Sequence, residues 1–237
     1  MKVQPWMLKR QVWSFYVASA GAAMTVVSLV LLKPAWALIC GFVTIASWWT
    51  TRVWTNRDPI PLPHAMGWAL LAPRPFQSSR RLKELLGFHG GERLLEVGPG
   101  TGKYTLPIAS SLGSGGTLAV LDIQQEMLDD LMRRASRAVI ANIVPTMGDA
   151  TRLPYPDDRF DGAYLITVLG EIPDKDAALQ DLRRVLKPDG CLVIGEIFFD
   201  PDFIPLADLQ RHLGRRGFAF KRKTGPWWAY LARFEKT

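Results

Sequence analysis

The sequence has few of the side chains that build disulfide and metal sites. Its 237 residues include two cysteines and three histidines. Cys40 lies in an apolar run and Cys191 in a stretch typical of a buried strand, so a disulfide framework is not indicated. The histidines are scattered along the chain, and we therefore expect no metal site.

Charge is almost absent from the first part of the chain. Residues 12–32 and residues 35–51 contain no charged side chain, and Lys33 and Pro34 separate the two runs. At 1.5 Å per helical residue, the first run matches a hydrocarbon core of about 30 Å, whereas the second is barely long enough. Small residues in both runs, such as Gly21 and Gly41, would let two helices pack closely. We therefore predict that residues 1–55 form a transmembrane or membrane-embedded hairpin of two helices.

Three other interpretations of this segment remain open: a cleaved signal peptide, a buried helical hairpin, and a shallow re-entrant hairpin in one leaflet. For a spanning hairpin, the flanking charges predict an orientation. Lysine and arginine precede the first run, two arginines, Arg52 and Arg57, follow the second, and only Lys33 lies between the runs. Because cytoplasmic loops are enriched in positive charge, we expect both termini and the following domain on the cytoplasmic side of the membrane.

Residues 56–77 are predicted to form a linker. Five prolines make its backbone stiff and extended: Pro59, Pro61, Pro63, Pro73 and Pro75. Within it, residues 64–72 are apolar and could form a short helix that either contacts lipid or covers the substrate-binding site. Residues 78–237 have the composition of an ordinary globular domain.

The most informative stretch of that domain is a glycine turn. The apolar segment 94–97 leads into Gly98, Gly100 and Gly102, and a helix-like segment follows. Glycines admit backbone angles that a Cβ would forbid and allow close approach to a ligand, so this pattern predicts a nucleotide-binding turn. Lys103 occupies the third glycine position of the dinucleotide fingerprint, which disfavours a nicotinamide reductase, and Tyr104 stands where a P-loop requires serine or threonine.

Strand and helix patterns alternate along the domain. Strands are predicted at residues 93–97, 117–121, 143–147, 160–167 and 191–199, and a closing antiparallel pair at 218–223 and 228–234. Helices are predicted at 78–86, 103–112, 125–137, 176–186 and 206–216. This order indicates an α/β fold with a Rossmann-like, seven-stranded sheet and helices on both faces, in which ligands bind beyond the carboxyl ends of the strands.

Polar residues occur at several of these strand ends. Asp122 follows the second strand and can accept hydrogen bonds from a ribose diol, or can cap the next helix. Asp149 and Ala150 follow the third strand, where a carboxylate and a backbone N–H can meet an adenine ring. Glu96 precedes the glycines and either contacts the ligand or holds the loop, and Thr167 ends the fourth strand.

Together these motifs resemble those of the class I S-adenosylmethionine (SAM) dependent methyltransferases, over roughly residues 78–235. Motif I corresponds to residues 96–102, motif II to residues 148–150 and motif III to residues 184–190, with Asp189 where the family usually has glycine. The resemblance is closest to the ubiquinone/menaquinone branch. It implies SAM as cofactor, bound by Glu96, Gly98, Pro99, Gly100, Thr101, Gly102, Asp122, Ile123, Asp149, Ala150 and Thr167.

The reaction implied is in-line methyl displacement, which requires alignment and desolvation, and a general base only for some acceptors. No base stands out, so no catalytic residue is predicted; the candidates are Tyr104, Glu171, His64 and Tyr155. Strand four ends in Leu-Ile-Thr-Val rather than Asn/Asp-Pro-Pro-Tyr/Phe, which argues against adenine, cytosine and glutamine acceptors.

The net charge of +7 fits either nucleic acid or an anionic membrane surface, and the hairpin favours the membrane. We interpret the basic residues near the C-terminus as contacts to lipid head groups, or otherwise as an ordinary solvated face; they are Arg211, Arg215, Arg216, Lys221, Arg222 and Lys223. The sequence thus predicts a membrane-anchored methyltransferase for a lipid-like or hydrophobic acceptor, without a nucleic-acid partner. The alternative is a non-catalytic SAM-binding membrane sensor or assembly protein. Nothing indicates the oligomeric state.

Overall fold

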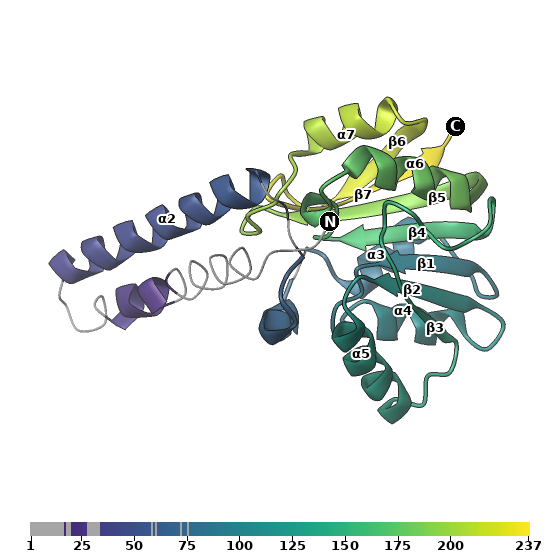
Figure 1. The fold of residues 1–237 in the computed structure, drawn as a ribbon, viewed down its shortest axis with the longest axis horizontal. Helices are drawn as coiled ribbons and strands as arrows, with labels where there is room; N and C mark the ends of the chain where they lie inside the picture. The colour runs from purple at the N-terminus through teal and green to yellow at the C-terminus, as the bar shows by residue number, and fades with distance from the viewer. Residues whose placement is uncertain are drawn as a thin grey trace. The chain divides into compact units, whose positions relative to one another are not determined.

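The computed structural model describes residues 17, 20–27, 34–57, 59, 61–71, 73–74 and 76–237. Its contacts divide the chain into two compact units, Met1–Pro63 and His64–Thr237. The ribbon in Figure 1 labels the helices and strands of both units.

The described residues of the first unit include two helical segments, residues 20–27 and α2 (Pro34–Arg57). They meet at Gly21, where an added Cβ would lie 2.5 Å from Oγ1 of Thr44 and 3.4 Å from the carbonyl oxygen of Cys40. Such close contact at a glycine agrees with the small-residue packing expected there. A Cβ on Gly41 would meet nothing within 4 Å, so Gly41 does not contribute to this contact.

Within the described ranges, no helix combines the length and the apolar character needed to cross a bilayer. The predicted crossing by residues 35–51 is therefore not supported. Most of the first apolar run, including residues 28–32, and the predicted turn at Lys33 lie outside the described residues. The helix α2 exposes many large apolar side chains, namely Trp36, Leu38, Ile39, Phe42, Val43, Ile45 and Trp49.

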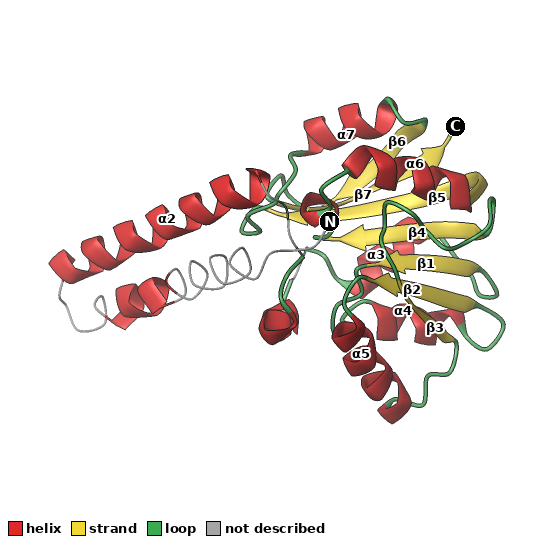
Figure 2. Ribbon diagram, viewed as in Figure 1, coloured by secondary structure: helices red, strands yellow, loops and turns green. Residues whose placement is uncertain are grey.

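The second unit is built on one seven-stranded sheet with the order β3-β2-β1-β4-β5-β7-β6 (Figure 2). Its strands are β1 (Arg93–Val97), β2 (Thr117–Asp122), β3 (Ile143–Met147), β4 (Phe160–Ile166), β5 (Leu186–Ile197), β6 (Phe218–Thr224) and β7 (Ala229–Lys236). The first five are parallel to one another, and β7 is antiparallel to both β5 and β6. The Rossmann-like sheet predicted from the sequence is confirmed.

Helices cover both faces of this sheet. The helices α3 (Ser79–Leu86), α4 (Thr105–Leu112) and α5 (Gln125–Arg137) pack on one face, and α6 (Lys175–Val185) and α7 (Leu206–Gly214) pack on the other. Because side chains alternate along a strand, Leu94 packs against α3, α4 and α5 on one face of the sheet. Leu95 and Val97 point to the opposite face, into the core formed with α6 and α7. Two short 3₁₀ helices complete the unit, η1 (His64–Leu71) and η2 (Leu169–Glu171).

Element ends follow local chemistry. The hydroxyl of Ser78 caps α3 by accepting a hydrogen bond from the N–H of Arg81, and Gly87 ends the helix with φ of +69°. The helix α4 begins at Thr105, two residues later than predicted, because residues 100–104 form turns. The turn predicted at residues 187–190 is instead an irregularity inside β5, where Asp189 adopts φ of +61°.

The register of the sheet brings the candidate residues to one edge. Val97 lies opposite Leu121 across the β1–β2 pair, and Glu96 lies opposite Tyr164 across the β1–β4 pair. The segments that follow β1, β2 and β4 therefore leave the sheet together. They carry the glycine turn, Asp122 and Thr167.

Candidate active site

The site is organised around residues 98–102, which we call the glycine cradle. All three of its glycines have positive φ, +70° at Gly98, +52° at Gly100 and +85° at Gly102. The N–H of Gly98 donates to the carbonyl oxygen of Leu121 at 2.8 Å, which extends the β1–β2 pairing into the cradle. A Cβ on Gly98 would overlap the side chain of Val168, so the backbone needs glycine here for space as well as for conformation.

Two buried hydroxyl groups, one in the cradle and one close after it, donate to no acceptor among the described residues. They are Oγ1 of Thr101 and the phenol oxygen of Tyr104. Buried polar groups are nearly always satisfied in a folded protein, so unpaired hydroxyls beside a bare glycine backbone are suited to a polar ligand. This arrangement fits the nucleoside and amino-acid groups of SAM, the cofactor implied by the motif.

Asp122 borders the cradle at the end of β2. Its Oδ1 accepts a hydrogen bond from the N–H of Gln124 at 2.9 Å. Burial raises the pKa of this carboxyl group, while backbone hydrogen bonds from Gln124, Gly100 and Ile123 act in the opposite direction. Asp122 thus bonds to the residue before α5 and also to the cradle, so both functions considered for it are compatible with its position. Ile123, the next residue, is half exposed.

Asp149 and Ala150 lie in the turn after β3. The N–H of Gly148 donates to the carbonyl oxygen of Asp122 at 2.9 Å, which places this turn next to Asp122. Oδ1 of the exposed Asp149 accepts hydrogen bonds from both the N–H and the hydroxyl of Thr151, each at 2.8 Å. Ala150 is buried in the core. In this structure the Asp149 side chain therefore stabilises its own turn.

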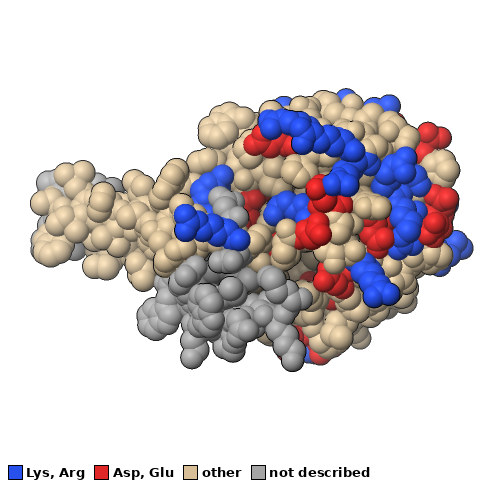
Figure 3. Space-filling model, turned by 45° about the horizontal axis from the view of Figure 1, so that its top comes forward, with Lys and Arg blue, Asp and Glu red and all other residues tan. Residues whose placement is uncertain are grey.

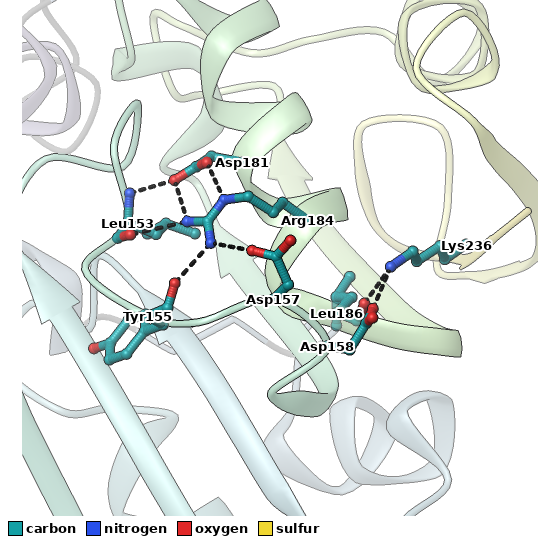
Figure 4. A network of polar contacts seen from close by, with 8 residues as sticks. All are labelled: Leu153, Tyr155, Asp157, Asp158, Asp181, Arg184, Leu186 and Lys236. Carbon is teal, nitrogen blue, oxygen red and sulfur yellow. Dashed lines mark hydrogen bonds and ion pairs between the residues drawn. The ribbon is translucent and has the colours of Figure 1, made fainter.

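The chain that continues from this turn is held by Arg184 of α6 (Figure 4). Its guanidinium donates to both carboxylate oxygens of Asp181, at 2.7 and 3.0 Å, and to Oδ1 of Asp157 at 2.9 Å. It also donates to the carbonyl oxygens of Tyr155 and Leu153, at 2.7 and 3.0 Å. Asp181 in turn accepts from the N–H of Leu153. Arg184 and Asp181 therefore fix the segment beyond the predicted adenine-binding turn.

Glu96 lies beneath the cradle, where it is almost fully buried. Its Oε2 accepts hydrogen bonds from the hydroxyl of Thr105 at 2.5 Å and from that of Tyr164 at 2.9 Å. Burial raises the pKa of Glu96 to about 7, although these two hydrogen bonds act to lower it. The carboxyl group thus ties β1 to α4 and β4, as expected if Glu96 holds the loop.

Thr167 follows β4 with an unusual φ of +56°. Its N–H donates to the carbonyl oxygen of Gly195 at 2.8 Å, and its hydroxyl accepts from Nη1 of Arg74 at 3.2 Å. Arg74 stands between two prolines of the linker and belongs to none of the sequence motifs. No local pattern distinguishes it there, since its partner is 93 residues away.

The 3₁₀ helix η1 lies over the cradle. A Cβ on Gly67 would come within 3.1 Å of Cγ2 of Thr101, and a Cβ on Gly100 would overlap the side chain of Leu70. His64 fixes the start of η1: its N–H donates to Oε1 of Gln124 at 3.1 Å, and its Nε2 lies 2.9 Å from Oδ2 of Asp130. From the sequence, residues 64–72 are expected either to contact lipid or to cover the substrate-binding site. The position of η1 over the cradle fits the second of these functions.

The four candidate bases lie in different segments of the fold. Tyr104 borders the cradle, and Glu171 lies in η2. His64 is engaged with Asp130 on the outer side of α5. Tyr155 packs edge-on against Phe160, with ring centres 5.0 Å apart. In the described part of the chain, no group of three or more His, Cys, Asp and Glu side chains is arranged to hold a metal ion.

The basic residues near the C-terminus lie among acids that come from elsewhere in the sequence. Arg216 pairs with Asp176 at 2.5 Å, and Lys221 pairs with Glu235 at 2.9 Å. Figure 3 shows acidic and basic side chains interspersed on the visible face. These ion pairs favour the alternative of a solvated face at Arg216 and Lys221.

Comparison with known proteins agrees with this geometry. Residues 95–194 match the sequence profile of a family described as "Methyltransferase domain". The chain is 36% identical over 124 residues to the ubiquinone/menaquinone biosynthesis C-methyltransferase of Vibrio vulnificus, an alignment covering 51% of this chain and 46% of that protein. The Pseudomonas putida protein of the same name is 37% identical over 114 residues, with 48% and 44% covered. The chain thus spans about half the length of these curated relatives.

Solved structures share the fold. A SAM dependent methyltransferase from Aquifex aeolicus superposes with a TM-score of 0.68 at 18% identity, covering 74% of this chain and 98% of that one. The [4+2]-cyclase SpnF superposes with a TM-score of 0.60 at 20% identity, covering 67% and 79%. At this level of identity the likeness concerns the fold alone.

Proposed function

We propose that this chain, whose second unit has the class I methyltransferase fold, is a SAM-dependent methyltransferase that transfers the methyl group of SAM to a hydrophobic acceptor. The glycine cradle, Asp122 and the turn at 148–150 would hold the nucleoside end of the cofactor. Thr101 and Tyr104 offer hydroxyl groups to the polar parts of the same cofactor. The remaining predicted contacts, at Glu96 and Thr167, support the cradle from below and from β4.

The observation that carries the choice of acceptor is a group of aromatic rings at the carboxyl edge of the sheet. Phe198 and Phe199 follow β5, and Trp227 and Trp228 precede β7. Their rings meet edge to face, with centres 5.6 Å apart for Phe198 and Trp227 and 6.4 Å apart for Phe199 and Trp228. Phe199 and Trp227 are 69% and 68% exposed. Exposed aromatic rings gathered beside a cofactor site favour an apolar, ring-containing ligand.

The curated relatives support the same class of acceptor. Their names describe C-methylation in ubiquinone and menaquinone biosynthesis. We extend this to the present chain as a quinone-type or similarly lipid-like ring. The match covers about half of each relative. The proposal therefore rests as much on the aromatic side chains of this chain as on the names of the relatives.

The chemistry divides between cofactor and protein. Bound SAM supplies a methyl group on a sulfonium centre, which an acceptor atom can displace in line. The protein's task is to align the acceptor and to exclude water. The position of η1 over the cradle suits water exclusion, because Leu70 and Gly67 approach Gly100 and Thr101 directly.

We further propose that the first unit attaches the protein to a membrane. Leu38, Phe42 and Ile45 are 76%, 73% and 67% exposed, and their spacing places them on one side of α2. An apolar helix surface of this size favours burial in lipid. In this arrangement residues 1–55 anchor the chain, residues 56–77 link, and residues 78–237 catalyse on the cytoplasmic side, close to an acceptor that stays in the bilayer.

The decisive experiment incubates membranes containing the full-length protein with methyl-labelled SAM and then extracts lipids into organic solvent. We expect label in the organic phase, in a product that mass spectrometry identifies by its added methyl group. Asp122→Asn should abolish most of this label, whereas Asp129→Asn, an exposed change on α5, should not. SAM binding without any labelled lipid would instead support the non-catalytic sensor, and absence of SAM binding would refute both.

A further inference from the structure

Arg74 lies beside the glycine cradle and makes few hydrogen bonds for an arginine. Nη1 of Arg74 donates to the hydroxyl of Thr167 at 3.2 Å, and the Arg74 side chain also interacts with the phenol oxygen of Tyr104. No carboxylate in the described part of the chain forms an ion pair with it. Its side chain is half-buried. A guanidinium group has five N–H donors in a planar fork, so most of the donors of Arg74 remain available.

Other arginines of this domain show what a purely structural arginine looks like here. Arg184 bonds to two carboxylates and two carbonyl oxygens. Arg233 bonds to Glu235 and to the carbonyl oxygens of Leu85 and Leu86. In both cases a carboxylate of the same domain pairs with the guanidinium group. Arg74 lacks such partners although it occupies the edge of the sheet at which ligands bind.

Tyr104 provides an independent observation at the same place. Its side chain is only 6% exposed, and no group among the described residues accepts the proton of its hydroxyl. Burial raises the pKa of Tyr104, whereas the charge of Arg74 and a hydrogen bond from its side chain act to lower it, so the two side chains lie next to each other. Within the described residues, the phenol is therefore a buried donor without an acceptor, next to a guanidinium without a carboxylate partner.

Two further features make the surroundings positive. Lys103 lies close to Arg74: burial lowers the pKa of Lys103 to about 8, and the positive charge of Arg74 acts in the same direction. The helix α4 begins at Thr105, directly after Tyr104, and its first N–H groups add partial positive charge. Glu96, the acid that influences Tyr104, already accepts bonds from Thr105 and Tyr164.

We propose that Arg74 and Tyr104 form a binding site for an oxyanion beside the glycine cradle. The guanidinium fork and the phenol O–H would donate to the same negatively charged group. Two sources present this chemistry at a methyltransferase site: the carboxylate at the methionine end of SAM and an ionised oxygen on the acceptor ring. The inference rests on the proposed function, and it assigns a ligand-binding role to a residue of the proline-rich linker.

The test compares two probes on the full-length protein by calorimetry. S-adenosylhomocysteine carries the carboxylate, and 5′-methylthioadenosine lacks the whole amino-acid end. If the cofactor supplies the oxyanion, Arg74→Gln weakens S-adenosylhomocysteine binding about 10- to 100-fold and leaves 5′-methylthioadenosine binding unchanged. Arg74→Lys restores part of the loss, and Tyr104→Phe shows a smaller loss of the same kind. Arg80→Gln, an exposed change on α3, is the control.

If the acceptor supplies the oxyanion, both probes bind Arg74→Gln normally and the KM for the acceptor rises about 10-fold or more at unchanged melting temperature. The proposal is overturned if Arg74→Gln changes neither probe binding nor the acceptor KM. It is also overturned if both probes lose affinity equally, because Arg74 would then only support the cradle. Failure of the unsubstituted protein to bind S-adenosylhomocysteine would refute the proposed function itself.

Discussion

The hydroxyl of Tyr164 donates a hydrogen bond to Oε2 of Glu96 at 2.9 Å, inside the core and directly beneath the glycine cradle. These residues face each other across the β1–β4 pair. The same oxygen accepts the hydroxyl of Thr105 at the start of α4. The buried carboxyl group of Glu96 on β1 thus bonds to α4 and to β4, the elements that adjoin the glycine cradle. A change in its protonation state therefore affects the support of the whole site.

Glu96 is expected to make stability depend on pH. Its pKa is raised from 4.5 to about 7 by burial, so the folded protein holds this proton more tightly than the unfolded chain does. The stabilising effect of the proton is complete below about pH 4.5 and is lost as the pH rises towards 7, a change on the order of 3 kcal/mol. Glu96→Gln, which cannot ionise, should therefore become more stable relative to the unsubstituted protein between pH 5 and pH 8.

Urea unfolding of both proteins at several pH values measures this difference. Glu84→Gln, a change at an exposed glutamate of α3, serves as the control and should show a constant difference. A constant difference for Glu96→Gln as well would mean that Glu96 is ionised throughout this range.

Gly98 should tolerate no side chain. In Gly98→Ala the Cβ would suffer both the strain of φ +70° and overlap with Val168. We expect a loss of about 2–4 kcal/mol in unfolding free energy, of which strain accounts for about 1 kcal/mol and overlap for the rest. Gly113→Ala is the matched control, because φ there is +65° and a Cβ would meet nothing within 4 Å. Equal losses in denaturant unfolding would show that space at Gly98 is unimportant.

Arg184 should contribute more to stability than a surface arginine. Removing its bonds to Asp181 and to the 153–157 segment in Arg184→Gln is expected to cost about 1–3 kcal/mol and to weaken SAM binding through the neighbouring adenine-side turn. Arg211→Gln breaks an exposed pair with Asp208 and should cost less than about 1 kcal/mol. Chemical denaturation and SAM titration measure both effects; similar costs for the two variants would contradict this role of Arg184.

The exposed surface of α2 should determine membrane attachment. Phe42→Asp places a charge among apolar side chains that we propose to be in lipid, and should lower the membrane-bound fraction about 10-fold or more. Sedimentation of membranes followed by immunodetection measures this fraction. Val139→Asp, at a residue 91% exposed in the second unit, makes the same kind of change elsewhere and should have no effect. If Phe42→Asp sediments like the unsubstituted protein, α2 is not the attachment surface.

Much of the fold could be predicted because its elements have strong local patterns. β1, β3 and α5 begin and end where the sequence indicated. The start of α4 and the path through residues 187–190 could not be predicted, because each depends on a turn whose geometry the neighbouring strands impose. For the site, the glycines and Asp122 are recognisable by spacing alone. The bonding partners of Glu96 are not, since Tyr164 is 68 residues away from it.

The sequence by itself determined the class of sheet, the position of the cradle and the cofactor, because hydrophobic periodicity and glycine spacing are local properties of the chain. Only the tertiary structure decided what surrounds the cradle. It placed η1 over Gly100, turned Glu96 towards Thr105 and Tyr164, neutralised Lys221 with Glu235, and brought Arg74 beside Tyr104. Each of these contacts joins residues on different elements, so packing of the whole domain was needed to create them.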